Sequence, residues 1–210
     1  MSGKLWIGVM EVGPIRTNCY ILRNGADSKE AVLIDPGDQP EQILAELRRE
    51  GTVPTAILLT HGHFDHILAV NRICQEMPDV KVYISEAEKT LVENPDLNGG
   101  SLHPGAVIHP DVFVKEGDLL ELAGLRFKVL LTPGHTAGSC CYYMEEEESL
   151  FAGDTIFRES YGRTDLPTGS YAEIMKSLER LLTELPEDTA VFPGHGPGTT
   201  IGYEKRIEGF

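Results

Sequence analysis

Residues 60–66, which read Thr-His-Gly-His-Phe-Asp-His, bring together several side chains that can bind metal ions. Three imidazoles and one carboxylate lie within six consecutive positions. His61, His63 and Asp65 alternate along the chain, so their side chains point to one side of an extended loop. His66 follows at once and approaches from a second direction. Imidazole nitrogen and carboxylate oxygen are ligands of divalent cations. A loop of merely solvated histidines rarely collects four such groups, so the stretch predicts a metal-binding loop.

Three further candidate ligands, His135, Asp154 and His195, each follow a predicted strand in a glycine-containing turn. Glycine beside a ligand lets the backbone turn sharply and leaves room for a cation and a substrate. Each turn alone is weak evidence. Together they add two imidazoles and one carboxylate at strand ends, where α/β folds collect functional residues.

The candidate ligands number seven, too many for one four-coordinate ion that keeps a position open for water. Two ions can use them if one carboxylate bridges. The seven then divide into a first set of His61, His63 and His135, a second set of Asp65, His66 and His195, and the bridging Asp154. Such a pair of ions can hold a hydroxide and bring the pKa of bound water down to about 7. We therefore predict two divalent ions, with zinc expected and iron or manganese also suited, and assign Asp65 and Asp154 to the catalytic centre.

The elements that must position these residues alternate between short strands and amphipathic helices. Strands are predicted at 5–12, 18–22, 31–34, 56–59, 81–84, 141–144, 149–152 and 190–192, and helices at 40–49, 65–76, 86–92 and from the capping box at 170–173 to about 185. Residues 112–122 and 125–131 are predicted as a hairpin with Gly124 at its turn. Interspersed strands and helices indicate sheets covered by helices, in a single domain over residues 1–210.

Several residues outside the ligand set also carry expectations. The segment 94–111 is rich in Asn, Gly, Pro and His and is predicted as an irregular loop that walls a substrate cleft. Its two histidines, His103 and His109, are expected to be non-ligands. Asp35 follows a predicted strand, and the sequence leaves it open between a turn carboxylate and a partner of a ligand histidine. Arg163 either binds a substrate carboxylate or pairs with Asp165, and the pairing is favoured.

The composition and charge of the chain argue against some classes of binding partner. The 210-residue chain is 41% hydrophobic and 24% charged, with a formal net charge of −15. Such an acidic chain is a poor partner for nucleic acid or an anionic membrane. No stretch approaches a membrane span, and residues 1–6 lack the apolar core of an export signal. The four cysteines show no disulfide framework, so we expect a reduced, cytoplasmic protein. The expected partner is a small-molecule substrate rather than nucleic acid or a membrane. Oligomeric state has no signal in the sequence.

The ordered set of seven ligands resembles that of the metallo-β-lactamase-fold hydrolases, over nearly the whole chain. The stretches Asn18–Tyr20, Ile34–Gly37 and Thr132–Thr136 are also similar. The resemblance implies a four-layer αβ/βα sandwich of the α/β class with the metals at one edge between the sheets. It implies the same division of the ligands between two ions, and a role for Asp35 as a buried aspartate that supports the metal loop.

Within that family the chain looks most like the glyoxalase II (hydroxyacylglutathione hydrolase) group, which hydrolyses thioesters such as S-lactoylglutathione. Residues 153–157 and 193–196 carry this likeness, with 94–98 and 162–165 in support. Full-length members continue into a C-terminal helical domain, whereas this chain ends fifteen residues after His195. It therefore resembles the short bacterial form, and this resemblance does not identify the thiol part of the substrate.

Two other functions fit the ligand set less well. Related persulfide dioxygenases use one iron in a two-histidine, one-carboxylate site, which His61, His135 and Asp154 could provide. A complete second set argues against this alternative. A purely structural metal site would be closed by four ligands, so seven ligands beside an open cleft argue against a binding protein without chemistry. The sequence therefore predicts a metal-dependent thioester hydrolase.

Overall fold

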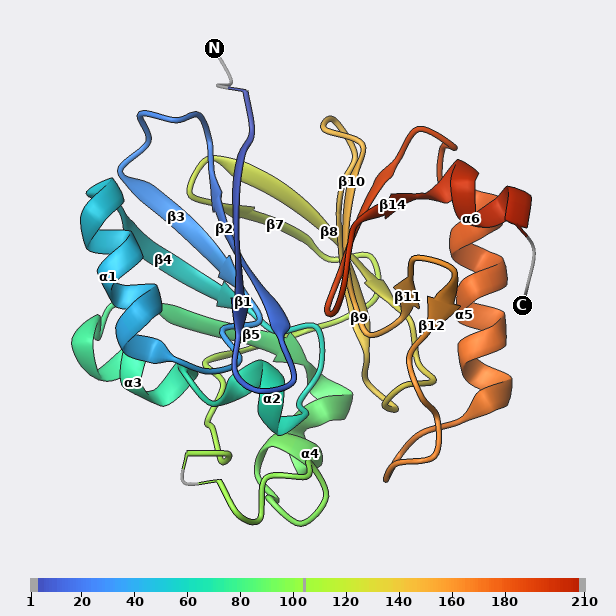
Figure 1. The fold of residues 1–210 in the computed structure, drawn as a ribbon, viewed down its shortest axis with the longest axis horizontal. Coiled ribbons are helices and arrows are strands. Elements are labelled where there is room, and N and C mark those ends of the chain that lie inside the picture. The colour runs from blue at the N-terminus through green and yellow to red at the C-terminus, as the bar shows by residue number, and fades with distance from the viewer. Residues whose placement is uncertain (1–3, 104, 208–210) are drawn as a thin grey trace.

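The computed structural model describes residues 4–103 and 105–207 and arranges them in four layers (Figure 1). Two six-stranded sheets face each other in the middle, with helices on the outer side of each. This architecture confirms the predicted αβ/βα sandwich. Residues 1–3, which begin the segment expected to lack an export signal, lie outside the described residues.

The first sheet is built from the N-terminal half of the chain. Its strands, in spatial order, are β1 (Trp6–Val12), β2 (Thr17–Arg23), β3 (Glu30–Ile34), β4 (Val53–Leu58), β5 (Lys81–Ser85) and β6 (Val112–Val114). The first three strands pair antiparallel, and β3 to β6 pair parallel. Because β3 and β4 are parallel neighbours, the segments that follow them leave the same edge of the sheet.

The second sheet comes from the C-terminal half. Its strands, in spatial order, are β14 (Thr199–Thr200), β13 (Ala190–Pro193), β10 (Ser149–Gly153), β9 (Cys140–Met144), β8 (Leu125–Leu131) and β7 (Leu119–Leu122). A separate two-stranded ribbon joins β11 (Ile156–Phe157) to β12 (Ser160–Tyr161). The parallel pair of β10 and β13 again sends two following loops off one edge.

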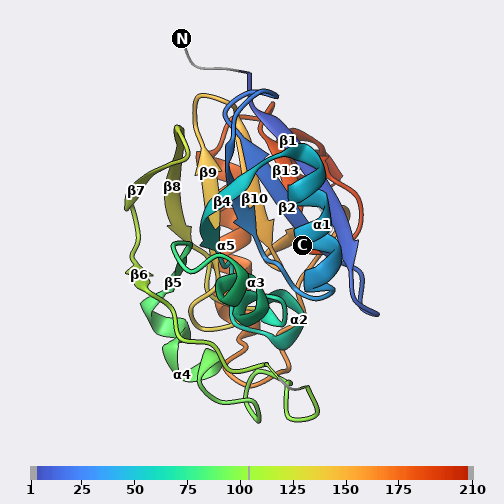
Figure 2. The same ribbon diagram turned by 90° about the vertical axis from the view of Figure 1, so that its left-hand side faces the viewer.

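Helices cover the outer faces of both sheets. The helical elements of the described residues are α1 (Pro40–Glu50), α2 (Phe64–Ile67), α3 (Val70–Glu76), the short 3₁₀ turn η1 (Glu86–Glu88), α4 (Lys89–Val92), α5 (Tyr171–Glu184) and α6 (Ile201–Ile207). Figure 2 looks onto the side where α1 and α3 lie over the first sheet. Leu44 and Leu47 of α1 pack in the same cluster as Ile57, and Leu178 of α5 packs with Leu150 on the far side. Across the described residues, every helix is too short or too polar to span a lipid bilayer.

A third apolar cluster fills the space between the two sheets. It includes Leu22 and Leu58 from the first sheet and Phe127, Tyr142 and Phe151 from the second, all of them buried. Alternate residues of β8 face this core, as the sequence pattern predicts. This shared core therefore holds the two sheets together next to the edge at which their strands end.

The helix predicted over residues 65–76 is interrupted, which corrects that prediction. The observed elements are α2 and α3, with Leu68 and Ala69 between them. The amide of Ala69 donates to the carbonyl of Pro36 (3.1 Å), and the amide of Leu68 donates to both Gly37 (3.2 Å) and Phe64. The carbonyl of Pro36, in the loop after β3, thus accepts an amide that an uninterrupted helix would bond internally, and the helix is interrupted there.

The strand predicted over residues 112–122 is also wrong as one element, because β6 and β7 belong to different sheets. The turn between them is held by the amide of Lys115, which donates to Asp118 Oδ2 at 2.8 Å. Gly117 adopts a positive φ of 79°, which few other residues tolerate. The hairpin predicted with residues 125–131 is therefore confirmed only for β7 and β8.

The prediction for the segment 94–111 is confirmed, whereas several short elements were not predicted. The segment 94–111 contains no helix or strand at its described positions, as expected. The elements β11, β12, β14 and α6 were not predicted. Two-residue strands are too short to show a period, and α6 follows β14 without an intervening polar stretch.

Candidate metal centre

The seven residues predicted as ligands converge at one edge of the sandwich, although they come from four separate stretches of the chain. His61 and His63 follow β4, and Asp65 and His66 lie in α2. The other three side chains follow strands of the second sheet: His135 after β8, Asp154 after β10 and His195 after β13. The cluster therefore lies at the edge where loops follow the strands of both sheets.

The first set forms a compact group of imidazoles. One nitrogen each from His61, His63 and His135 lies within 4.8 Å of the others. His63 Nδ1 and His135 Nε2 are 2.9 Å apart. All three side chains are buried. This is a three-nitrogen site of the kind that can hold one divalent cation.

The second set lies beside the first and is more open. The nearest ligand atoms of Asp65, His66 and His195 also fall within 4.8 Å of one another. Asp65 Oδ2 is 3.4 Å from His195 Nε2 and 3.6 Å from His66 Nε2. His66 is fully buried, while the side chain of His195 is 22% exposed. The second group can hold a cation and is the more exposed to solvent of the two.

Asp154 lies between the two groups. Its Oδ1 is 3.4 Å from His66 Nε2, and its Oδ2 is 3.5 Å from both His135 Nε2 and His195 Nε2. The carboxylate thus borders on imidazoles of both sets. This is the position that a bridging ligand requires.

Hydrogen bonds to one nitrogen of an imidazole leave the other nitrogen for a cation. His135 Nδ1 donates to the carbonyl of Arg163 (2.7 Å), and His66 Nδ1 contacts Asp35 Oδ2 (2.9 Å). His61 Nδ1 lies 3.1 Å from Thr60 Oγ1. In each case Nε2 remains for a cation, and the partner fixes the orientation of the ring.

Asp35 supports this arrangement from behind. Its Oδ1 accepts the Thr60 amide (2.8 Å), and its Oδ2 accepts the Thr60 hydroxyl (2.6 Å) in addition to contacting His66. The residue is buried and adopts a positive φ of 48°. Of the two roles that the sequence left open, the contact with a candidate ligand histidine is the one observed.

Buried atoms without partners test whether a cation fits. Among the described residues, His61 Nε2, His63 Nε2 and Asp154 Oδ1 are buried and make no hydrogen bond. A buried polar atom left unsatisfied costs about 1–3 kcal/mol. All three atoms belong to residues of the clustered set, and Asp154 Oδ1 lies 3.4 Å from His66 Nε2. The donor set and these unsatisfied atoms both fit bound divalent ions.

The two groups differ in electrostatics. Burial, reinforced by the neighbouring imidazoles, lowers the pKa of His61 well below its usual range and that of His63 to about 4. Burial also acts to lower the pKa of His195, but the carboxylates of Asp154 and Asp65 outweigh it and raise that pKa to about 9. At neutral pH the first group is therefore ready to bind a cation, whereas the second must first release a proton.

The pKa values of the carboxylates shift in the opposite direction. Burial acts to raise the pKa of Asp65, but the charge of His66 and the contact with His195 outweigh it and hold the pKa at about 2. The pKa of Asp154 lies well below its usual range, since His66 again outweighs burial. Both carboxylates are ionised at neutral pH and available to cations.

Three residues outside the ligand set, Arg163, His103 and His109, are placed as the sequence analysis favours. Arg163 pairs with Asp165 through two hydrogen bonds of 2.7 and 2.8 Å. Among the described residues, His103 and His109 belong to none of the potential cation clusters. The His103 ring stacks on Phe64 with the centroids 4.6 Å apart, which brings the 94–111 loop against α2.

Some supporting residues were not found by sequence reasoning. Asn18 Nδ2 donates to the carbonyls of Pro193 (3.0 Å) and Gly196 (2.9 Å) and so holds the loop of His195. The buried Glu88 accepts backbone amides from two ligand-bearing loops. Neither side chain has a local sequence pattern that would identify it, because its partners are far away in the chain.

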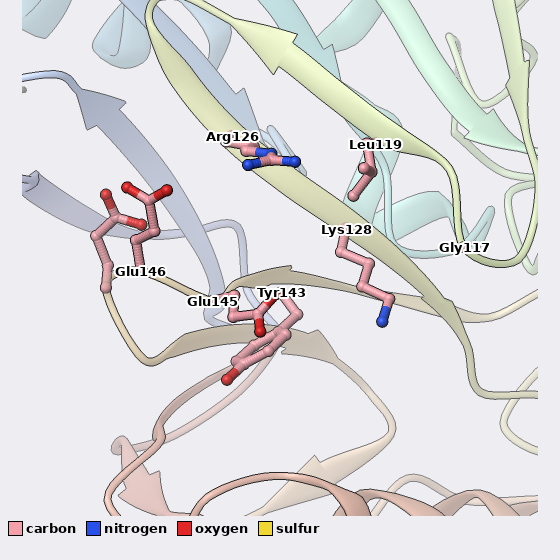
Figure 3. A pocket seen from close by; sticks show the side chains of 8 residues that line it. Gly117, Leu119, Arg126, Lys128, Tyr143, Glu145 and Glu146 are labelled. Carbon is pink, nitrogen blue, oxygen red and sulfur yellow. The ribbon is translucent and has the colours of Figure 1, made fainter.

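A hollow elsewhere on the surface does not coincide with this centre. The pocket in Figure 3, about 490 Å³ in volume, lies on the outer face of β8 and β9. Its lining includes Arg126, Lys128, Tyr143 and Glu145 but none of the seven predicted ligands. The chemistry-bearing residues are thus at the sheet edge rather than in this pocket.

Comparison with known proteins shows which family this chain matches. Residues 12–195 match the family model described as the metallo-beta-lactamase superfamily. The chain is 34% identical over 208 residues to the hydroxyacylglutathione hydrolase GloC of Haemophilus influenzae, with 97% of each chain covered. It superposes on the crystal structure of the BLEG-1 B3 metallo-beta-lactamase with a TM-score of 0.89 and 41% identity, covering 96% of this chain and 97% of that one. The TTHA1623 structure in a di-iron-bound form gives a TM-score of 0.84 and 39% identity, covering 97% and 99%.

Proposed function

Because the chain belongs to the metallo-β-lactamase superfamily, we propose that it is a metal-dependent hydrolase of small acyl-thioesters. The observation that carries the proposal is the pair of three-residue clusters with Asp154 between them. In this proposal His61, His63 and His135 hold one ion, and Asp65, His66 and His195 hold the other. Zinc is the expected metal, and a similar structure described as di-iron-bound supports iron as the alternative.

Two divalent ions would supply a nucleophile at neutral pH, since they lower the pKa of water to about 7, and would polarise the thioester carbonyl. The protein's own groups orient the reactants. Asp65 is ionised, and its Oδ2 accepts a hydrogen bond from Thr17 Oγ1 (3.0 Å), so the carboxylate is held in place beside His195. Asp65 and Asp154 can each accept a hydrogen bond from the attacking water and direct its lone pair toward the carbonyl carbon. A thiolate is a good leaving group, so no dedicated general acid is required.

The thioester preference is supported by the likeness to GloC, whose name describes hydrolysis of a hydroxyacylglutathione. Nearly complete coverage of both chains supports the comparison. We propose a small 2-hydroxyacyl thioester as substrate and a cytoplasmic location for the reaction. Arg163 pairs with Asp165, and this pairing partly neutralises its charge. We therefore do not assign Arg163 to the binding of a substrate carboxylate.

A mononuclear iron persulfide dioxygenase is the alternative, with His61, His135 and Asp154 as its ligands. The second cluster argues against it, because Asp65, His66 and His195 lie within 4.8 Å of one another and would have no role. The likeness to a metallo-beta-lactamase makes a β-lactam a necessary comparison substrate.

The test combines metal analysis with turnover on one sample purified without added metal. We expect about two divalent ions per chain and hydrolysis of S-lactoylglutathione that a chelator abolishes. His195→Gln should remove one ion and lower kcat by at least about tenfold, since it removes a ligand of one ion. The matched control is His109→Gln, the same change at an exposed histidine outside every cluster.

Other outcomes would decide against the proposal. One iron per chain, no thioester hydrolysis and oxygen uptake with a persulfide would favour the dioxygenase. Faster hydrolysis of a β-lactam than of any thioester would make the chain a β-lactamase. Equal losses in H195Q and H109Q would show that His195 has no special role.

A further inference from the structure

Glu88 is a buried carboxylate that links two loops of the candidate centre. It ends η1, directly after β5, and is 1% exposed. Its Oε2 accepts the amide of Gly62 at 2.7 Å, and its Oε1 accepts the amide of Gly138 at 2.8 Å. Each oxygen therefore bonds the backbone of a different loop.

Those two loops carry all three imidazoles of the first cluster. Gly62 lies between His61 and His63, and Gly138 is three residues after His135. One loop leaves the first sheet after β4, and the other leaves the second sheet after β8. The carboxylate thus connects the two halves of the sandwich at the point where the first cation would be held.

Glycine at both loop positions lets the backbone approach Glu88. A Cβ on Gly138 would lie 2.7 Å from Glu88 Oε1, and one on Gly62 would lie 2.5 Å from Val92 Cγ1. Both distances are shorter than real contacts allow, so a larger residue would push the amide away from the carboxylate. The contacts of Glu88 with the two loops therefore depend on glycine at positions 62 and 138.

The charge of Glu88 has no ion-pair partner among the described residues, since none of their ion pairs includes it. Burial raises its pKa, and hydrogen bonds from Thr136, Gly62 and Gly138 act against that rise. Burying a carboxylate without a cation carries a desolvation penalty that an apolar side chain would avoid. What only the carboxylate offers here is two acceptor oxygens, one for each loop.

We propose that Glu88 is a positioning residue that sets the separation between the His61–His63 loop and the His135 loop, and so shapes the first cation site. The inference rests on the proposed metal centre and extends it to a residue that touches neither cation nor substrate. Residues that orient metal ligands typically change affinity or activity 10- to 100-fold when they are replaced.

The test is Co²⁺ titration of the full chain with Glu88→Gln, followed by visible absorption. Glutamine keeps the shape of the side chain but offers one acceptor, so one loop amide faces an NH₂ group instead of an oxygen. We expect Co²⁺ to bind the first site about 10- to 100-fold more weakly and its ligand-field bands to shift. The titration step lost in H195Q identifies the second site, which E88Q should leave in place.

Glu86→Gln is the matched control, because it makes the same change on the same turn. Glu86 is exposed and faces Lys115 at 3.6 Å. If E88Q is unfolded, Gly138→Ala decides instead, since its Cβ would displace the carboxylate from that loop alone. Wild-type affinity and spectrum in folded E88Q, or in folded G138A in its place, would overturn the inference and leave the proposed function intact. A wild-type chain that binds no Co²⁺ would overturn the proposed function, and this inference with it.

Discussion

Asp35 lies behind the candidate centre, where one carboxylate satisfies three groups. It accepts the Thr60 amide and hydroxyl and holds His66 Nδ1 at 2.9 Å. Two of these contacts fix the strand end that leads into His61, and the third fixes a candidate ligand itself. The orientation of the imidazole therefore depends on a side chain that would not touch the cation.

Asp35→Asn should weaken both the fold and the centre. The new NH₂ group leaves at least one of the three partners without an acceptor, and an unsatisfied buried donor costs about 1–3 kcal/mol. We expect unfolding at lower urea and roughly 10- to 100-fold weaker metal binding in the second site. Urea titration of the metal-free protein and metal titration of the folded protein measure the two effects separately.

Asp27→Asn is the control for that experiment, since Asp27 is exposed on a loop of the same sheet. It should change neither quantity. If D35N bound metal as tightly as the wild type, then the contact with His66 would have no influence on the second site.

At the scale of elements, the loop after β3 decides where α2 lies. The carbonyls of Pro36 and Gly37 accept the amides of Ala69 and Leu68, so this loop and the α2–α3 junction are bonded to each other. A Cβ on Gly37 would lie 1.7 Å from the carbonyl oxygen of Asp65. The close approach of these two backbones brings Asp65 and His66 to the sheet edge.

Gly37→Ala should therefore displace α2 and destabilise the protein. The neighbouring atom is backbone and cannot turn aside, so we expect a loss of about 3 kcal/mol or more. The second metal should be lost before the first, because α2 carries Asp65 and His66. Urea unfolding and metal content of the folded fraction provide the measurement.

The matched change is Gly198→Ala at an exposed glycine, where the nearest atom is the Val191 carbonyl oxygen at 3.2 Å. It should lower the free energy of unfolding by less than about 1 kcal/mol. Similar losses in G37A and G198A would mean that the α2 junction tolerates displacement.

At the scale of the whole molecule, two sheets that share one core present their strand ends at the same edge. The candidate centre joins side chains from both sheets, so a bound cation would link the two halves of the chain. The net charge of −15 also favours cation binding at this edge. Metal binding should therefore stabilise the entire sandwich rather than one loop.

Removing the metal should lower the unfolding temperature, and the effect should depend on pH. A ligand that binds only the folded state stabilises by about 4 kcal/mol at a thousandfold excess over its Kd. The pKa of His195 in the metal-free protein is about 9, above its ordinary value of 6.5. The stability contributed by this proton is complete below pH 6.5 and is lost as pH rises through 9.

Metal binding follows the opposite trend, because the cation must displace the same proton. The difference in Tm between metal-loaded and chelator-treated protein should consequently widen from pH 6.5 to pH 9. Calorimetry at several pH values measures it, and restoring metal by dialysis should restore the higher Tm. A constant or narrowing difference would argue against a cation at His195.

The candidate ligands and most of the elements that carry them could be predicted from the amino-acid sequence. Three imidazoles and a carboxylate in six positions need no tertiary contact to be recognised, and long strands and helices reveal their period locally. Tertiary structure alone decided that the stretch 112–122 divides between two sheets and that the helix after the metal loop is interrupted. It also revealed Glu88 and the partners of Asp35. These features depend on hydrogen bonds between residues far apart in the chain, such as Glu88 with Gly138, fifty positions away, and no local pattern encodes such a partner.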